Sequence, residues 1–222
     1  MSSNRYADLD KLIKEYEEDS ITVRSERLVM KNYPKVLTMS AASSFEHNIK
    51  NACQDFLDNP KLPLVPYYPK INSIRQSPLV DKIYGKLEAY NDNGIEHLAA
   101  DKFYDLFGTS FKTDVQTIFA IKLQEKKAAV TAKVNSLLPL CGTEDKYDLD
   151  YAKQSDLKIE LDRCSFDDAE RAFLNLKLRR NRVAHDYIHG LSDTFADILK
   201  FYNLAVIYAI SVEAAIKNLT VT

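Results

Sequence analysis

The chain has 222 residues, with 30 Lys and Arg against 32 Asp and Glu and a formal net charge of −2. This length fits one large domain, and the near-zero net charge excludes a protein that attracts nucleic acid through an overall basic charge, so any such site needs a local basic patch. The three cysteines are isolated, which argues against a zinc site or a disulfide framework and favours a reducing, cytoplasmic compartment.

The composition of the chain is helical, because it has only five glycines and long stretches lack turn residues. The first residues are polar and charged, a pattern that indicates no signal peptide. One helix is predicted over 6–30 and a second over 34–57, with Pro34 in its first turn. Five of the seven prolines lie within 60–80, so this segment is predicted to be an irregular connector.

The middle of the chain is predicted to hold shorter helices before a long one. Short helices are expected over 79–90 and 94–107, and a long helix over 114–138, where apolar residues recur at helical spacing. Residues 143–164 are polar, and the brief alternation of apolar and polar residues at 158–161 favours a short strand or turn there.

The last two helices begin with capping signals. Asp167 precedes Glu170 by three residues, a variant of the capping box. Ser192 or Asp193 can cap the final helix. The longest apolar run, 201–210, is too short to span a bilayer and indicates a helix buried inside the protein, so no membrane contact is expected.

Together these elements predict an all-α fold. We expect a single domain over 1–222, built as an antiparallel up-and-down helical bundle with an N-terminal helix and an irregular insertion at about 60–160. The long helices and the short turns between them are the basis of this prediction.

The residues most suggestive of chemistry lie near the end of the penultimate helix, at Arg180, Asn181 and His185. Residues four apart share a helix face, and the long Arg180 side chain can swing toward that face. An imidazole can transfer protons near neutral pH, and a guanidinium can bind phosphate oxygens bidentately. RNA supplies its own nucleophile, the 2′-hydroxyl, so these groups could cleave it without a metal. The sequence shows no metal-ligand cluster, and neither a metal nor a cofactor is expected.

One protomer offers one histidine at this motif, although the reaction needs both an acid and a base. A twofold dimer would place two copies side by side. The motif therefore predicts a homodimer with a composite cleft.

Arg180-Asn181-x-x-x-His185 resembles the signature of the HEPN family, an all-helical superfamily with an Arg-x4–6-His motif. The resemblance implies a HEPN-type bundle, homodimerisation and metal-independent ribonuclease activity. The chain is similar to the larger bacterial HEPN proteins of the MAE and RiboL-PSP types. Its Arg-x4-His-x-Tyr form also resembles HEPN toxins of toxin–antitoxin pairs, in which the tyrosine, here Tyr187, is adenylylated by the antitoxin.

Further residues enter through the same resemblance. The stretch that ends at Glu46 resembles the first core helix of the larger HEPN proteins, and Glu46 would then orient Arg180. His189 could supply a second imidazole four residues beyond His185.

The leading hypothesis is a cytoplasmic endoribonuclease, a bacterial toxin or phage-defence effector that acts on RNA and has an antitoxin or defence-system partner. One alternative is a non-catalytic HEPN-type helical dimer that binds a nucleotide, RNA or a protein. Another is a structural dimer in which the basic helix end has no chemical role. The intact Arg-Asn-x-x-x-His set favours the first.

Overall fold

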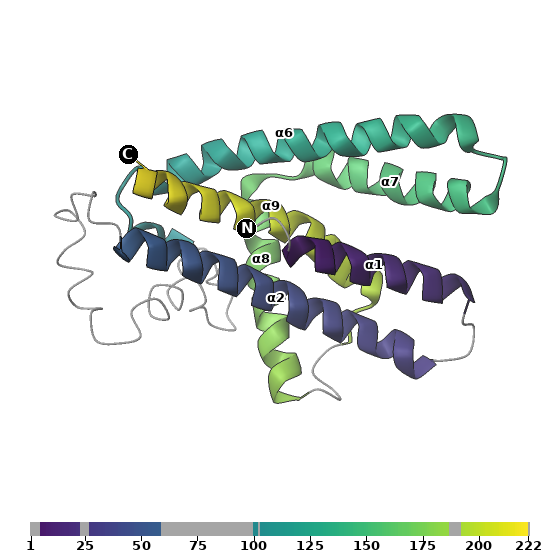
Figure 1. The fold of residues 1–222 in the computed structure, drawn as a ribbon, viewed down its shortest axis with the longest axis horizontal. Helices are drawn as coiled ribbons and strands as arrows, with labels where there is room; N and C mark the ends of the chain where they lie inside the picture. The colour runs from purple at the N-terminus through teal and green to yellow at the C-terminus, as the bar shows by residue number, and fades with distance from the viewer. Residues whose placement is uncertain (1–4, 23–26, 59–99, 102, 187–191, 222) are drawn as a thin grey trace.

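The structure is a computed structural model that describes residues 5–22, 27–58, 100–101, 103–186 and 192–221. The regular structure in these ranges is all helical, which confirms the predicted all-α class (Figure 1). In chain order the helices are α1 (Arg5–Thr22), α2 (Arg27–Asp58), α6 (Phe111–Leu137), α7 (Asp145–Arg163), α8 (Phe166–His185) and α9 (Phe195–Val221), with a short 3-10 turn η2 (Leu138–Leu140) after α6.

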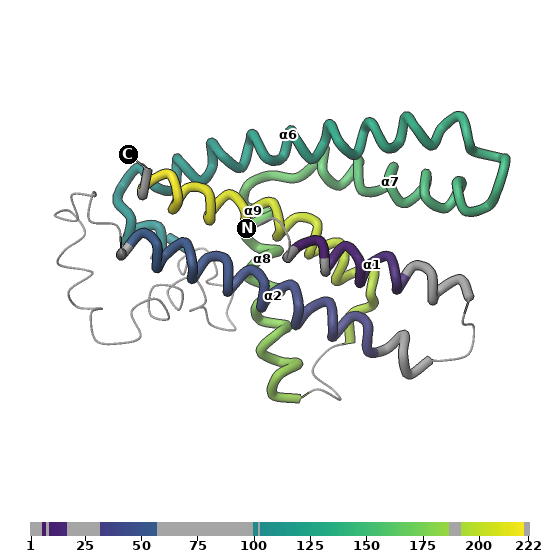
Figure 2. The backbone as a smooth tube through the Cα atoms, viewed as in Figure 1, coloured from purple at the N-terminus to yellow at the C-terminus, as the bar shows by residue number. Residues whose placement is uncertain are grey.

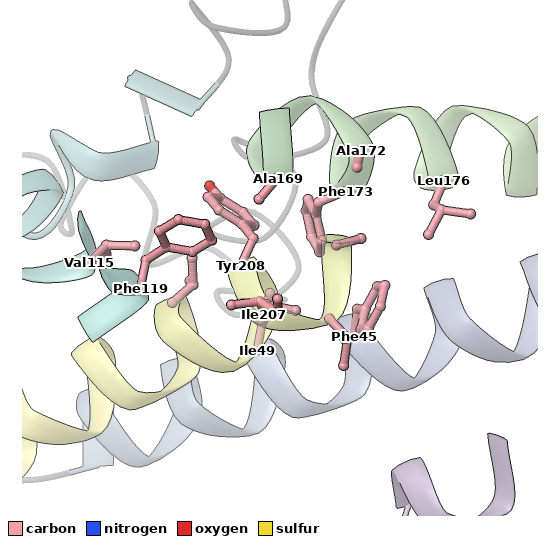
Figure 3. Packing of buried hydrophobic residues seen from close by; sticks show 14 of the residues in the cluster. Phe45, Ile49, Val115, Phe119, Ala169, Ala172, Phe173, Leu176, Ile207 and Tyr208 are labelled. Carbon is pink, nitrogen blue, oxygen red and sulfur yellow. The ribbon is translucent and has the colours of Figure 1, made fainter. Parts of the chain in front are cut away.

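The centre of the fold is α9, which packs against α2, α6 and α8. In Figure 1 α9 runs between α6 above and α2 below, and α1 packs against α2. Figure 3 shows how rings from three helices meet in the core: Phe45 of α2, Phe173 of α8 and Tyr208 of α9 are fully buried. Removing such large apolar surfaces from water is the main source of stability in this bundle.

The apolar composition of α9 is explained by this central place. Its segment Phe195–Leu219 is long and apolar enough to cross a membrane by length and composition, with a mean hydropathy of 1.5, yet 56% of the most apolar window is buried inside the protein. A core helix passes the same test, since it too is apolar on most of its faces.

The predicted C-terminal end of the first helix was wrong. It was expected to reach residue 30, but α1 ends at Thr22 and Arg27 already begins α2. Pro34 therefore lies inside α2 and not in its first turn. The residue is buried, and its carbonyl accepts a hydrogen bond of 2.7 Å from the Thr38 hydroxyl. Burial of the ring in the bundle offsets the backbone hydrogen bond that a proline removes from a helix.

The predicted strand or turn within 143–164 was also wrong, because this segment forms α7. Figure 2 shows α6 and α7 side by side as an antiparallel hairpin. Leu161 is the one residue of α7 that is buried, and Ile159 is half exposed. A helix that packs mainly against one other helix, here α6, needs no full apolar stripe, so the sequence lacked the usual signal. Much of the predicted irregular insertion at 60–160 is thus regular helix, while the proline-rich connector and the helix at 79–90 lie outside the described residues.

The residues that cap α8 and α9 lie one or two positions away from the predicted capping residues. Ser165 caps α8 and exchanges hydrogen bonds with Asp168 in a complete capping box, whereas Glu170 points into the core. At the start of α9, Thr194 exchanges the equivalent hydrogen bonds with Asp197. The long helix predicted over 114–138 agrees with α6.

Candidate functional site

The predicted motif lies at the C-terminal end of α8. The first part of this helix is buried through Phe173 and Leu176, and in the view of Figure 1 its C-terminal end extends past α2. Asn181 and His185 are exposed, and Val183 between them is buried. Four residues of helix advance by about 400°, so Asn181 and His185 share one exposed face.

Arg180 faces α2 instead. Its Nη2 donates a hydrogen bond of 2.9 Å to Oε2 of Glu46, and the Arg180 side chain is 23% exposed. The structure therefore brings together Arg180 and the carboxylate that the family resemblance suggested for it. His185 lies about 140° further round the helix from Arg180, so the two can act on one phosphate if the guanidinium swings or if two subunits combine.

Glu46 binds a second cation through its other oxygen. Lys50 Nζ lies 2.6 Å from Glu46 Oε1, one helical turn further along α2. Partial burial alone would raise the pKa of the Glu46 carboxyl, but the hydrogen bond from Lys50 and the charges of Lys177, Lys50 and Arg180 outweigh it and leave the pKa below its ordinary value. Glu46 is therefore ionised at neutral pH.

Lys177 completes this group of charges, one turn before Arg180 on α8. Only 2% of the residue is exposed, and its Nζ lies 5.8 Å from the centre of the Phe173 ring. Burial lowers the pKa of Lys177 well below its ordinary value; the charge of Glu46 opposes this shift, and the charges of Arg180 and Lys50 add to it. We call Glu46, Lys50, Lys177 and Arg180 the α2–α8 charge cluster.

The neighbouring Arg179 has a structural role instead. Its Nε and Nη2 donate to the two oxygens of Asp193 at 3.1 and 2.9 Å, and its guanidinium lies 4.4 Å from the centre of the Phe201 ring. This bidentate pair connects the end of α8 to the start of α9. Of the two adjacent arginines, Arg180 is therefore the one that belongs to the α2–α8 charge cluster.

Two other predicted residues, Tyr187 and His189, lie outside the described residues. Sequence reasoning missed Lys50 and Lys177. A signal for Lys177 was present, since this lysine lies on the apolar face of α8 beside Phe173 and Leu176. Within the described ranges, no three His, Cys, Asp or Glu side chains are grouped so that they could hold a metal ion.

The structure also has a groove of about 870 Å³ between α1, α6, α7 and α9. Apolar residues such as Ile13 and Val206 line it, together with lysines and carboxylates such as Lys153 and Glu160. This mixture of charges favours no single ligand class. None of the described α8 residues lines the groove, so it is separate from the α2–α8 charge cluster.

The motif and its geometry are the basis for assigning a function, because no protein-family model, curated protein or solved structure matches this chain.

Proposed function

We propose that this chain is a metal-independent endoribonuclease of the HEPN type, acting as a bacterial toxin or phage-defence effector in the cytoplasm. The observation that carries the proposal is the ion pair of 2.9 Å between Arg180 and Glu46, at the end of the helix that bears the exposed His185. A carboxylate that holds a guanidinium in place makes it a ready partner for phosphate oxygens.

The reaction follows from these groups. His185 accepts the proton of the ribose 2′-hydroxyl, and the oxygen then attacks the adjacent phosphorus. Arg180 stabilises the negative charge of the phosphorane. A second, protonated imidazole donates its proton to the departing 5′-oxygen as the phosphorus–oxygen bond breaks. The products are a 2′,3′-cyclic phosphate and a 5′-hydroxyl, and Asn181 orients the imidazole or the ribose.

The second imidazole is best supplied by a second copy of the chain. His185 is exposed, and the end of α8 that bears it extends past α2 (Figure 1). A twofold axis near this helix end would bring two histidines to one strand of RNA. Under this proposal the protein is a homodimer with a composite cleft, and an antitoxin or defence-system partner would control it.

A second candidate is a HEPN-type dimer that binds a nucleotide, RNA or a protein without cleaving RNA. The angle of about 140° between Arg180 and His185 around α8 favours this candidate, because it separates the cation from the imidazole within one protomer.

Cleavage of RNA by the purified protein in EDTA tests the proposal. We expect products that end in 2′,3′-cyclic phosphate, and a loss of about 10²–10⁴-fold in rate for His185→Ala. Two control variants should cleave at the wild-type rate. His47→Ala changes a histidine of α2 that contacts Asn51, and Arg171→Ala changes an exposed arginine of α8.

Cleavage that persists in the Arg180→Ala/His185→Ala double variant would exclude these residues from the chemistry. Binding of RNA without cleavage by the wild-type dimer would instead select the non-catalytic candidate.

A further inference from the structure

One side of α7 packs on α6, and the opposite side is exposed in the part of the chain that the structure describes. The buried and half-buried residues of α7 recur on one side, through Tyr147, Gln154 and Leu161. Helical geometry puts a second set of residues on the opposite side. All of these are exposed: Asp145, Leu149, Ala152, Asp156, Ile159 and Arg163. We call these six residues the outer face of α7.

Two large apolar side chains lie on the outer face. Leu149 is 50% exposed and Ile159 is 49% exposed. The residues of the face are separated alternately by four and three positions, which is the spacing at which one helix packs along another in a coiled coil. A single exposed Leu or Ile is common on a protein surface, but two of them on one stripe with this spacing favour a helix as the partner.

The pattern of the outer face is complementary to itself. Two copies of α7, antiparallel and centred on the middle of the face, would place Leu149 opposite Ile159 and Asp145 opposite Arg163. Each of these pairs would occur twice, as a twofold axis requires. We infer that the outer face of α7 binds the same face of a second copy of this chain. The inference goes beyond the proposed function and does not rest on it, because α7 carries none of the motif residues.

Charge favours one orientation and one register of this pair. Asp145 lies in the first turn of α7 and Arg163 in the last turn, so opposite charges meet at both ends only when the helices are antiparallel. In a parallel pair each of them would meet its own copy, and like charges repel. A shift of the antiparallel pair by seven residues would place Asp145 opposite Asp156 and would separate Leu149 from Ile159.

The middle of the outer face allows a close approach of the two helices. Ala152 is small, and it would lie opposite Asp156 of the other copy. Asp156 also lines the groove beside α7, so its carboxylate can keep contact with water from that side. A polar residue at one position of such a stripe fixes the register of the pair at some cost in stability.

The charges beside the outer face nearly cancel across the proposed contact. Lys146 would lie near Glu160 of the other copy, where the charges attract. Asp148 would lie near Asp162, where they repel, but Lys158 lies 2.7 Å from Asp162 in the same chain and weakens this repulsion. The pairs at the two ends of the face therefore decide the sign of the electrostatic interaction.

The size of the contact predicts a weak association. With 19 residues, α7 is about 28 Å long. One helix against one helix buries less than the roughly 800 Å² per partner of a standard interface, so we expect a Kd of about 10–100 μM. If the chain also pairs at the end of α8, the contact through α7 adds a second, separate association step.

Sedimentation velocity of the full chain, at concentrations below and above this Kd, measures the association. Leu149→Lys and Ile159→Lys should each weaken it at least about tenfold, because each variant places two charges in the apolar part of the contact. The matched control is Ile121→Lys on α6, which also replaces an exposed branched residue, 54% exposed, but outside the outer face. Its association should equal that of the wild type, and all three variants should keep the wild-type Tm.

Exchange of the end charges tests the orientation. Asp145→Arg and Arg163→Asp should each weaken self-association about twofold to tenfold, since each creates two pairs of like charge. An equal mixture of the two variants should recover wild-type association, because one chain then has two basic ends and the other two acidic ends. If the two residues only stabilise the ends of their own helix, mixing will recover nothing.

Crosslinking tests the register. Cys53 is buried, so a background of Cys141→Ser and Cys164→Ser leaves no exposed native thiol among the described residues. In this background a short bismaleimide should link a mixture of the Leu149→Cys and Ile159→Cys variants but neither variant alone, because two copies of the same residue would lie about 15 Å apart along the helices.

Three results would overturn the inference. The first is a chain that does not associate over the whole concentration range. The second is association that Leu149→Lys and Ile159→Lys leave unchanged, which would assign the contact to another surface. The third is crosslinking within one cysteine variant and not in the mixture, which would exclude the antiparallel register.

Discussion

Two glutamates, Glu170 on α8 and Glu46 on α2 facing α8, differ in their burial and in their hydrogen-bond partners. Glu170 is 1% exposed, and its Oε1 accepts hydrogen bonds from two hydroxyl groups. Tyr104 donates one and Tyr208 the other at 3.5 Å, and the two tyrosine oxygens are 2.5 Å apart. Burial, together with the charge of Glu170, raises the pKa of both tyrosines well above the ordinary value, so they remain donors. The Glu46 side chain is 25% exposed, and its two oxygens pair with Arg180 and Lys50.

The difference separates a structural polar group from a candidate binding site. Two tyrosine hydroxyls donate to Oε1 of this almost fully buried carboxylate, and a buried, hydrogen-bonded polar group of this kind stabilises a fold. The Glu46 carboxylate instead pairs with charged groups and is partly exposed to solvent. Substitutions at Glu170 should therefore change stability, and those at Glu46 should change activity.

The largest effect is expected for Glu170→Ala. This change leaves a cavity and removes the acceptor shared by Tyr104 and Tyr208, so the free energy of unfolding should fall by about 3 kcal/mol. For a chain of this size that corresponds to a decrease in Tm of about 6–12 °C. Thermal unfolding followed by circular dichroism measures it. A Tm within one degree of the wild type would show that the Tyr–Glu network contributes nothing.

The matching change at the other carboxylate, Glu46→Gln, should lower Tm far less and reduce the rate of RNA cleavage about tenfold to hundredfold. The amide can still accept a hydrogen bond from Arg180, but it no longer holds the guanidinium by charge. Single-turnover cleavage measures the effect, with Glu170→Gln assayed below its own Tm as the control for a change in fold. Equal losses of rate in the two variants would remove the distinction between the two glutamates.

The fold was predictable where a helix buries one face in the core. α6 and α8 each have buried residues at helical spacing, and their existence followed from the sequence. α7 was missed because Leu161 is its one buried residue. The junction of α1 and α2 was misplaced because Pro34 was read as a helix start, whereas packing places it in the interior of α2.

The site was predictable only in part. The pairing of Arg180 with Glu46 followed from the motif and the family resemblance, although the two residues are 134 positions apart. Lys50 and Lys177 could not be joined to it from the sequence, because their proximity depends on which faces of α2 and α8 meet. The place of Lys177 on the apolar face of α8 indicates its burial, but the carboxylate that it meets on α2 is set by the packing of the two helices.

A smaller effect is expected for Tyr104→Phe, which removes one hydroxyl from the network around Glu170. Tyr208 lies 3.5 Å from the same Glu170 oxygen and remains as a donor, so the loss of stability should be about 1–2 kcal/mol, the range for one buried hydrogen bond. Urea unfolding measures the change, and RNA cleavage should be unaltered. A loss of cleavage without a loss of stability would show that the network serves the active site.

The smallest expected effect is an increase in stability, for Lys177→Met. Replacing a buried ammonium with an apolar side chain of similar length should raise the free energy of unfolding by about 1 kcal/mol near neutral pH. The gain depends on pH, because the pKa of Lys177 in the fold lies well below that in the unfolded chain. Between these two values the unfolded state binds a proton that the folded state lacks, so wild-type stability rises with pH through this window.

The advantage of Lys177→Met over the wild type should therefore be largest below the folded pKa and shrink as the pH approaches about 10. Urea unfolding of both proteins at about pH 6, 8 and 9.5 follows it, and all three values lie above the range in which Glu46 takes up a proton. The exposed Lys158→Met on α7 is the control and should show no such trend. A gain that is constant with pH would mean that the Lys177 ammonium is not penalised by burial. A loss of stability at every pH would mean that the charge of Lys177 is needed to hold α2 and α8 together.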